Sequence, residues 1–104
     1  MDVTKLVRVC LLEELLPGDM QAMTAEGEKI LVANVEGRIY AVSNICTHEY
    51  AELANGFLIE HTITCPLHLS RFRLETGEVL NPPASKSLRT YNVVIRENVV
   101  YVQV

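Results

Sequence analysis

The chain has 104 residues and a formal net charge of −4 at pH 7, with 49% hydrophobic and 21% charged residues. A chain of this length and composition can bury a core without disulfide bonds, so we expect one domain over residues 1–104 rather than a disordered segment. The acidic balance argues against nucleic acid as a partner, because few side chains could neutralise phosphates.

Short apolar runs between turn residues predict β-strands in the first half of the chain. One helical turn is expected at 12–16, where Pro17-Gly18 would end it. The run at 29–35 is almost entirely apolar, which is typical of a strand inside a sheet. The strands expected in this half are 3–10, with Val3, Leu6 and Val9 toward the core, then 20–25, 29–35 and 38–43.

Turn signals continue through the second half, at Asn55-Gly56, Thr76-Gly77 and Arg96-Glu97-Asn98. Many short strands without a long helical period predict an all-β fold, an antiparallel sandwich or barrel. Residues 44–84 would form a smaller insertion on a body built from the flanking strands. The strands expected here are 57–59, 62–64, 72–74, 78–80 and a final hairpin, with Tyr91, Val93 and Ile95 on one face and Val100, Val102 and Val104 on the inner face of the last strand.

The insertion contains two short cysteine–histidine motifs. Cys46-Thr47-His48 is a C-x-H motif and Cys65-Pro66-Leu67-His68 is a C-x-x-H motif, with sixteen residues between His48 and Cys65. Thiolates and imidazoles are common metal ligands. The motifs therefore predict a metal site whose ligands are Cys46, His48, Cys65 and His68.

The order of the ligands bears on which metal this site binds. One interpretation is a single structural zinc ion, which would make the protein a zinc-stabilised interaction module. Zinc sites usually place two cysteines close together in the sequence, followed by two histidines. Here each loop offers one cysteine and one histidine, which suits a two-metal centre whose irons take unlike ligand pairs. Both interpretations stay open at this point.

The paired motifs, with Phe72, Thr76-Gly77 and the proline loop that follows, resemble those of Rieske-type [2Fe-2S] proteins, above all the small ferredoxins of bacterial aromatic-ring dioxygenase systems. The resemblance implies a Rieske-like β body with a smaller cluster-binding subdomain. It also implies one [2Fe-2S] cluster, with Cys46 and Cys65 on a buried iron and His48 and His68 on an outer one. The loop at Pro82-Pro83 would cover this cluster.

The resemblance further implies an electron carrier rather than an enzyme. It would take single electrons from a flavoprotein reductase that oxidises a nicotinamide cofactor, and pass them to a terminal Rieske oxygenase of aromatic-compound degradation. Docking would be transient, at the tip formed by His48 and His68, and we expect a monomer. A small Rieske subunit of another redox complex, such as nitrite reductase, is an alternative.

The residues outside the motifs limit the function further. Once a cluster takes two histidines only His61 remains, and we expect its side chain to be solvated. An oxygenase subunit needs a second iron bound by two histidines and a carboxylate, which this chain cannot supply. Cys10 lies in an apolar segment and should be a buried, reduced thiol. With no signal-peptide pattern and no apolar run near the roughly 20 residues of a membrane span, we expect a cytoplasmic protein.

Positions around the second motif set expectations for the reduction potential. Ala51 and Leu67 stand where respiratory Rieske proteins carry a disulfide, which indicates the low-potential branch. Ser70 stands where high-potential members donate a hydroxyl, whereas Phe72 replaces their tyrosine and cannot donate. Ser70 would either donate to a cluster sulfur or only cap its turn.

The residue after each histidine is often glycine in the resembled family, but here it is Glu49 and Leu69. Both changes should alter the surface around the exposed histidines. Leu69 would either contact a redox partner or pack under the proline loop, and we favour the partner contact. Arg71 and Arg73 should point outward and form local ion pairs.

Overall fold

The computed structural model describes residues 5–104, whose regular secondary structure is almost entirely β-strand. The larger of its two sheets is built from β1 (Leu6–Leu11), β2 (Met20–Ala25), β3 (Glu28–Val35), β4 (Arg38–Ser43), β8 (Thr90–Arg96) and β9 (Val99–Gln103). The smaller sheet is built from β5 (Phe57–Ile59), β6 (Thr62–Thr64) and β7 (Arg71–Arg73). Two 3-10 turns, η1 (Leu12–Glu14) and η2 (Leu53–Asn55), complete the secondary structure. Among the described residues, no helix is long and apolar enough to cross a membrane.

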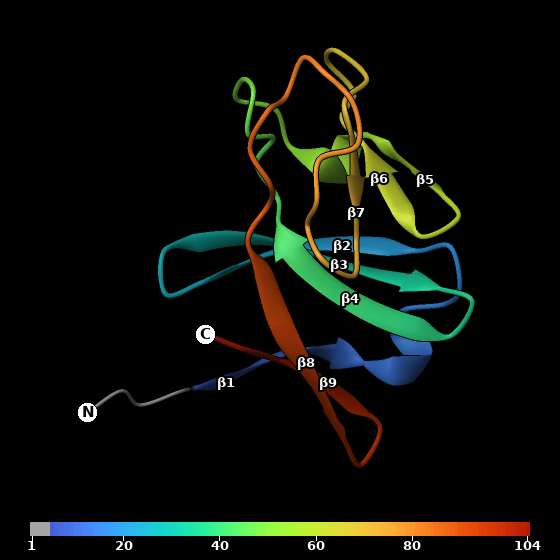
Figure 1. Cartoon of the computed structure of the whole chain (residues 1–104). Helices are drawn as coiled ribbons and strands as arrows, with labels where there is room; N and C mark the ends of the chain where they lie inside the picture. Colours follow the sequence, from blue (N-terminus) through green and yellow to red (C-terminus); the bar gives the residue numbers. More distant parts are fainter. Residues whose placement is uncertain (1–4) are drawn as a thin grey trace.

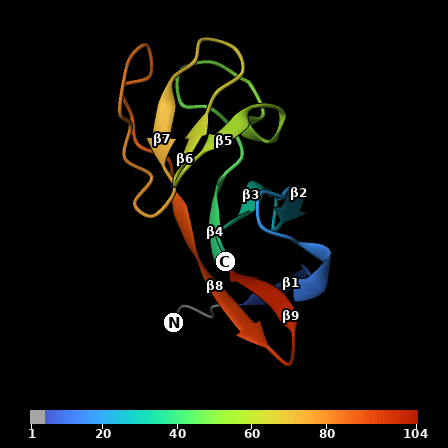
Figure 2. The ribbon, with the colours of Figure 1, turned by 90° about the vertical axis from the view of Figure 1, so that its right-hand side faces the viewer.

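All strand pairs are antiparallel, in the order β1-β9-β8-β4-β3-β2 and, in the smaller sheet, β5-β6-β7. Figures 1 and 2 show the larger sheet curling into a barrel-like body, with β5, β6, β7 and three loops above it. The upper part is the chain between β4 and β8. The predicted all-β fold with a smaller subdomain on a β body is confirmed.

Strand β3 is buried on both faces, which explains why its sequence lacks alternation. Ile30 and Val32 belong to a core cluster inside the body, together with Val100 and other residues of the larger sheet. Leu31 and its alternate neighbours belong to a second cluster, which the smaller sheet covers. Because successive strand residues point to opposite faces, a strand covered on both sides is apolar at nearly every position.

The second core cluster joins the body to the upper part and supports the two motifs. From the body it contains Leu31, Ala33, Val35, Tyr40 and Val42. From the upper part it contains Leu53, Ile63, Phe72 and Leu74, together with Cys46, Cys65, Ala84 and Leu88. The two motif cysteines are therefore part of the hydrophobic core rather than of the surface.

Some predicted strand bounds are wrong. β7 covers 71–73 rather than 72–74, and 78–80 is not a strand, because only Val79 pairs, with Phe72. The loop that begins at Asn81 leads into two prolines, which lack the backbone N–H needed to extend the pairing. In the first strand Val9 packs on the core as expected, whereas Leu6 belongs to neither cluster and Val3 lies outside the described residues.

The three residues predicted to share one face of β8 differ in their exposure. Tyr91 and Val93 pack against the body core, but Ile95 is 46% exposed. β4 pairs only with the first two residues of β8, Thr90 and Tyr91, so the far end of β8 has no strand on that side. The inner face of β9 is as predicted, with Val100 and Val102 fully buried.

Cys10 is a buried free thiol, as predicted. Burial is the main cause that raises the pKa of this thiol above its ordinary value, and the nearby Glu14 carboxylate adds to the effect. A thiol in this state is a poor nucleophile and poor metal ligand. Cys10 is therefore part of the packing of the body and not of the motif site.

Two glycines with the same backbone conformation give a matched test of packing around the upper part. Gly27 and Gly77 both have φ +78°, but a Cβ at Gly27 would meet open space, whereas at Gly77 it would overlap the Leu88 carbonyl oxygen. Leu88 N–H donates to Gly77 C=O at 2.8 Å, so this contact holds the chain that returns to β8.

We predict that Gly27→Ala lowers the free energy of unfolding by about 1–2 kcal/mol, the cost of a left-handed conformation for an L-residue. Gly77→Ala should lower it by at least about 1 kcal/mol more, because the backbone around Leu88 must also shift. Denaturant titration of both variants measures the difference. Equal losses would contradict the close packing at Gly77.

Candidate metal centre

Each motif cysteine closes its own loop with a backbone hydrogen bond. The Cys46 N–H donates to Ala51 C=O at 2.9 Å, and the Cys65 N–H donates to Ser70 C=O at 2.8 Å. Both loops are thus closed by a bond from the cysteine to the fifth residue after it. This geometry places each cysteine at the base of its loop and each histidine further out.

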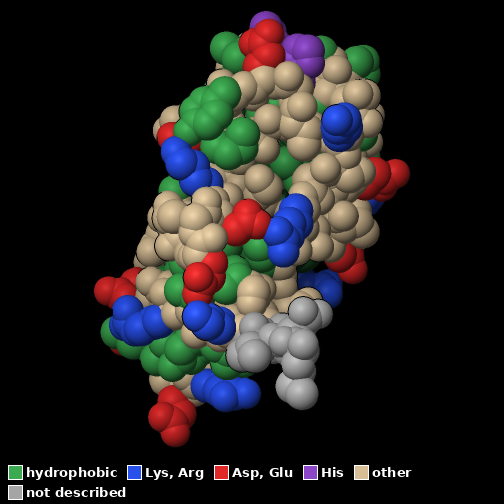
Figure 3. All heavy atoms as spheres, turned by 90° about the vertical axis from the view of Figure 1, so that its left-hand side faces the viewer, with side chains coloured by type: hydrophobic (Ala, Val, Ile, Leu, Met, Phe, Trp, Pro, Cys, Tyr) green, Lys and Arg blue, Asp and Glu red, His purple; other side chains and the backbone are tan. Residues whose placement is uncertain are grey.

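The four motif residues lie at two depths. Cys46 and Cys65 are 5% and 1% exposed, within the second core cluster. The side chains of His48 and His68 are 34% and 45% exposed, and their ring centroids are 5.3 Å apart. Figure 3 shows histidine side chains together at one end of the molecule, with acidic and hydrophobic side chains beside them. The thiol pair is inside and the imidazole pair is outside.

Side-chain hydrogen bonds connect both motif loops to the proline loop. The Thr47 hydroxyl donates to Lys86 C=O at 2.6 Å, and the Asn81 amide donates to Leu69 C=O at 3.2 Å. The side-chain oxygen Oδ1 of Asn81 also accepts from the Arg71 N–H at 2.8 Å. The three loops have little regular secondary structure, so these bonds fix their relative positions.

Asn44 fixes the start of the first motif loop. It is 1% exposed, and its side-chain oxygen accepts from the Ala54 N–H at 2.9 Å while its amide donates to Glu52 at 3.1 Å. Its backbone C=O accepts from the Leu53 N–H at 2.7 Å. Asn44 precedes the first motif loop and its partners follow it, so these hydrogen bonds hold the two ends of that loop together.

The surroundings of Cys46 favour the neutral thiol unless a bound cation compensates the charge of the thiolate. Burial is the main cause that raises the pKa of this thiol, and the neighbouring Cys65 thiol raises it further. The backbone N–H groups of His48 and Glu49 donate toward the sulfur and act in the opposite direction. A bound metal would compensate the charge of a buried thiolate, and the two N–H groups would stabilise it further.

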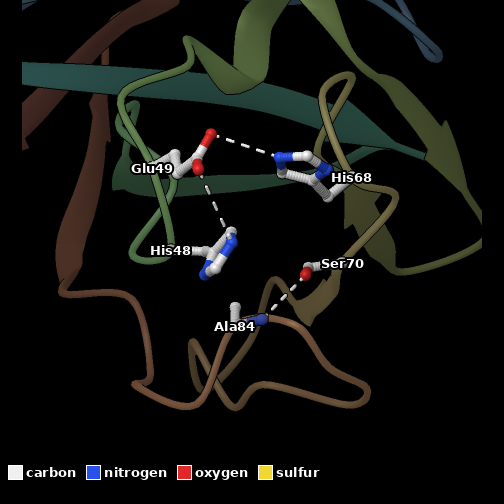
Figure 4. Close-up of polar contacts among 5 residues, drawn as sticks. All are labelled: His48, Glu49, His68, Ser70 and Ala84. Atoms are coloured by element: carbon white, nitrogen blue, oxygen red, sulfur yellow. Dashed lines mark hydrogen bonds and ion pairs between the residues drawn. The ribbon is translucent and has the colours of Figure 1, made fainter.

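Ser70 is fully buried beside this site. Its hydroxyl oxygen accepts a hydrogen bond from the Ala84 N–H of the proline loop at 3.0 Å (Figure 4). In residues 5–104 the Ser70 hydroxyl accepts this hydrogen bond and donates none to a protein group. A buried hydroxyl normally donates as well as accepts. Its free proton therefore suits an acceptor that belongs to a bound group.

Glu49 lies across the outer edges of both imidazoles (Figure 4). Its carboxylate accepts from His68 Nε2 at 3.2 Å, and its other oxygen lies 4.0 Å from His48 Nε2. Since the Nε2 atoms of both rings face Glu49, the Nδ1 atoms are the ones left to bind metal on the inner side.

The arrangement distinguishes a single metal ion from a two-metal centre. The ligand atoms that lie within 4.8 Å of one another are those of His48, Glu49 and His68, and among the described residues no such group includes a cysteine. One tetrahedral ion would need all four sulfur and nitrogen ligands around one point. Two separated ligand pairs, one of thiols and one of imidazoles, fit a [2Fe-2S] cluster with two cysteines on one iron and two histidines on the other.

Other predicted residues have mixed outcomes. Arg71 and Arg73 are exposed as expected, and Arg73 pairs with Glu78 at 3.4 Å. Leu69 is 56% exposed, so it does not pack under the proline loop. Its φ of +63° is a conformation that favours glycine, which accounts for the residue usual at this place in the resembled family.

The His61 side chain is 45% exposed, as the expectation of a solvated residue requires, but it also has two specific contacts. Its Nδ1 lies 3.1 Å from the Tyr40 hydroxyl and its Nε2 lies 3.3 Å from a Glu36 carboxylate oxygen. These contacts connect the β5–β6 turn to the β3–β4 hairpin, away from the motif loops. Sequence reasoning also missed the roles of Asn44 and Asn81, because neither lies in a motif and only their burial and hydrogen bonds reveal them.

Comparison with known proteins identifies the family. The profile of the Rieske [2Fe-2S] domain matches residues 5–92. The chain belongs to the Rieske [2Fe-2S] family. The ferredoxin component of the naphthalene 1,2-dioxygenase system of Pseudomonas putida is 40% identical over 91 residues, which is 88% of each chain. The predicted [2Fe-2S] cofactor is thereby confirmed.

Solved Rieske structures match the whole fold. The ferredoxin of carbazole 1,9a-dioxygenase from Nocardioides aromaticivorans IC177 has a TM-score of 0.90 and 34% identity, covering 93% of this chain and 95% of that one. A chain from a complex of reduced oxygenase and oxidized ferredoxin in carbazole 1,9a-dioxygenase also has a TM-score of 0.90, with 31% identity over 93% of this chain and 91% of that one. A putative nitrite reductase small subunit from Mycobacterium tuberculosis has a TM-score of 0.89 at 20% identity, covering 99% and 97%, which shows the shared fold alone.

These matches bear on the resemblance drawn from the sequence. The resemblance to ferredoxins of aromatic-ring dioxygenase systems is confirmed, since the relatives carry that description. They are ferredoxin components and not the oxygenases themselves, as expected for an electron carrier. The ligand assignment within the centre remains a prediction.

Replacing Ser70 separates its two possible roles. We predict that Ser70→Ala lowers the reduction potential by about 40 mV, because a hydrogen bond to a cluster sulfur worth about 1 kcal/mol stabilises the reduced state. Voltammetry of the purified protein measures this shift. Ser43→Ala is the control, since the Ser43 hydroxyl accepts from the Ile45 N–H at 3.3 Å and only caps a turn.

The control variant should keep the wild-type potential. A Ser70→Ala protein that is less stable but has an unchanged potential would mean that Ser70 only holds the proline loop.

Proposed function

We propose that this chain is the electron-carrying ferredoxin of a dioxygenase system that oxidises aromatic compounds. In this proposal Cys46 and Cys65 bind the inner iron of the cluster, and His48 and His68 bind the outer iron through Nδ1. The observation that carries the assignment is the separation of the buried thiol pair from the exposed imidazole pair. When bound, the [2Fe-2S] cluster supplies one-electron redox chemistry.

The buried thiols and the exposed imidazoles have different roles in this proposal. The buried thiols and the core around them exclude water from the inner side of the centre. The imidazoles replace two anionic ligands by neutral ones, which raises the potential relative to a centre with four cysteines. Their exposed edges at the end of the molecule give electrons a short path to a partner.

The surface around the histidines suits brief contact with a protein partner. Leu67 and Leu69 are 49% and 56% exposed in the second motif loop, next to His68. Exposed apolar side chains beside a redox centre favour docking, and a small interface permits rapid dissociation. We propose that this tip contacts the terminal oxygenase, consistent with the complex formed by the carbazole 1,9a-dioxygenase relative. A flavoprotein reductase using NADH or NADPH would supply single electrons at the same tip.

The thiols support a proposal about where the protein is found. All three cysteines are free, as expected in the reducing cytoplasm, where we place the protein. We propose a monomer that docks with each partner in turn.

The two rival functions are less well supported. A nitrite reductase subunit shares the fold, but at 20% identity against the 40% of the naphthalene dioxygenase ferredoxin. A zinc-stabilised module would need the thiols and imidazoles to surround one ion, whereas they lie in two separate pairs. Both comparisons favour the ferredoxin.

Electron transfer to an oxygenase tests the proposal. The reduced protein is mixed in a stopped-flow instrument with the oxidised terminal oxygenase of a naphthalene dioxygenase system, and oxidation of the ferredoxin is followed by absorbance. We expect second-order transfer that becomes slower as the histidine tip is altered. A reduced protein that holds its cluster but transfers no electrons to such oxygenases would contradict the proposed function.

Leu69→Asp should slow this transfer about tenfold, the loss expected when a docking contact worth about 1.4 kcal/mol is removed. Aspartate tolerates positive φ better than leucine, so the loop and the cluster should be retained. Leu16→Asp is the matched control, because Leu16 is 58% exposed but lies after η1 in the body. Equal slowing by both variants would show a general charge effect instead of a docking contact.

A further inference from the structure

Glu49 is the only charged side chain that contacts both histidines of the centre, among the residues that the structure describes. Its carboxylate accepts from His68 Nε2 at 3.2 Å and lies 4.0 Å from His48 Nε2. One side chain thus contacts both imidazoles of the proposed outer pair.

The position of Glu49 follows from the first motif loop. Cys46 and Ala51 close that loop through their backbone, which places Glu49 near its tip and opposite His68 of the second loop. No backbone hydrogen bond is found directly between the two motif loops in residues 5–104. The Glu49–His68 contact is therefore a direct connection between them, as Figure 4 shows.

A carboxylate that accepts from the outer N–H of a metal-bound imidazole has two physical effects. It increases the basicity of the ligand, which makes the imidazole a stronger donor to the metal. It also places a negative charge near the centre, which opposes the addition of an electron. Both effects favour the oxidised state, so both lower the reduction potential.

The geometry points to Glu49 as the residue that lowers the reduction potential of the centre and orients its two imidazole ligands. This inference rests on the proposed binding of the cluster by His48 and His68. Glu49 is a positioning residue, since it acts through the imidazoles and not on the metal itself. Its side chain is 53% exposed, so its effect is partly screened by water and salt.

Two substitutions separate the charge from the hydrogen bond. Glu49→Gln removes the charge but leaves an oxygen that can still accept from His68 Nε2, whereas Glu49→Ala removes both. Glu13→Gln is the matched control, because it makes the same change in net charge at η1 in the body.

The experiment is equilibrium redox titration of the purified proteins, preceded by electron paramagnetic resonance spectra of each. At a fixed ambient potential, Glu49→Gln should raise the ratio of reduced to oxidised protein about fivefold, the size expected for an exposed unit charge at close range. Glu49→Ala should raise it at least as much and change the spectrum, because the imidazoles lose their orienting contact. Glu13→Gln should leave the ratio within about twofold of the wild type.

The outcomes distinguish this inference from the proposed function. A wild-type protein without a mixed-ligand cluster signal would overturn the proposed function, and the inference about Glu49 with it. An intact cluster signal in all four proteins, with a ratio in both Glu49 variants within about twofold of the wild type, would overturn the inference alone. An increase in Glu13→Gln equal to that in Glu49→Gln would also overturn it, since the effect would then come from net charge.

Discussion

The backbone hydrogen bonds from Cys46 to Ala51 and from Cys65 to Ser70 set the depth of the four proposed ligands. With the cysteines fixed at the loop bases, their sulfurs lie in the core, and the histidines two and three residues later reach the surface. A [2Fe-2S] cluster with mixed ligands needs this difference in depth, because its inner iron is shielded from water and its outer iron exchanges electrons.

The loops that carry the ligands are stabilised by side-chain contacts more than by regular structure. In place of the hydrogen bonds between strands, the side-chain amides of Asn44 and Asn81 bind the backbone of these loops. The Thr47 hydroxyl joins the first motif loop to the chain that returns to β8. Below them, the core shared by β3 and the smaller sheet provides a rigid support. Rigid support matters for an electron carrier, because little movement of the ligands accompanies the change of charge.

Much of the fold could be predicted from the sequence, for identifiable physical reasons. Turn residues such as Glu26-Gly27 and Glu36-Gly37 mark strand ends locally, and β2 and β4 have the predicted bounds. The apolar run at Ile30–Val35 predicts an interior strand, and its burial on both faces explains that run. Burial at Ile95 could not be predicted, because it depends on how far β4 extends beside β8, which alternation within one strand does not encode.

The sequence predicts the candidate ligands of the site but not the contacts that support them. Spacing within Cys46–His48 and Cys65–His68 identifies the ligand types, because metal chemistry restricts them to a few residues. The contacts of Glu49 with His68, and of His61 with Tyr40, join residues that are far apart in sequence, and no motif predicts these pairs. Such contacts depend on the relative positions of loops, which only the folded chain determines.

The most direct test of the account is the electron paramagnetic resonance spectrum of the dithionite-reduced protein as purified, with iron and zinc measured in the same sample. The account predicts two irons per chain and a rhombic signal whose average g is well below that of a ferredoxin with four cysteine ligands. No signal, together with one zinc per chain, would contradict the separation of thiol and imidazole ligands on which the proposed function depends.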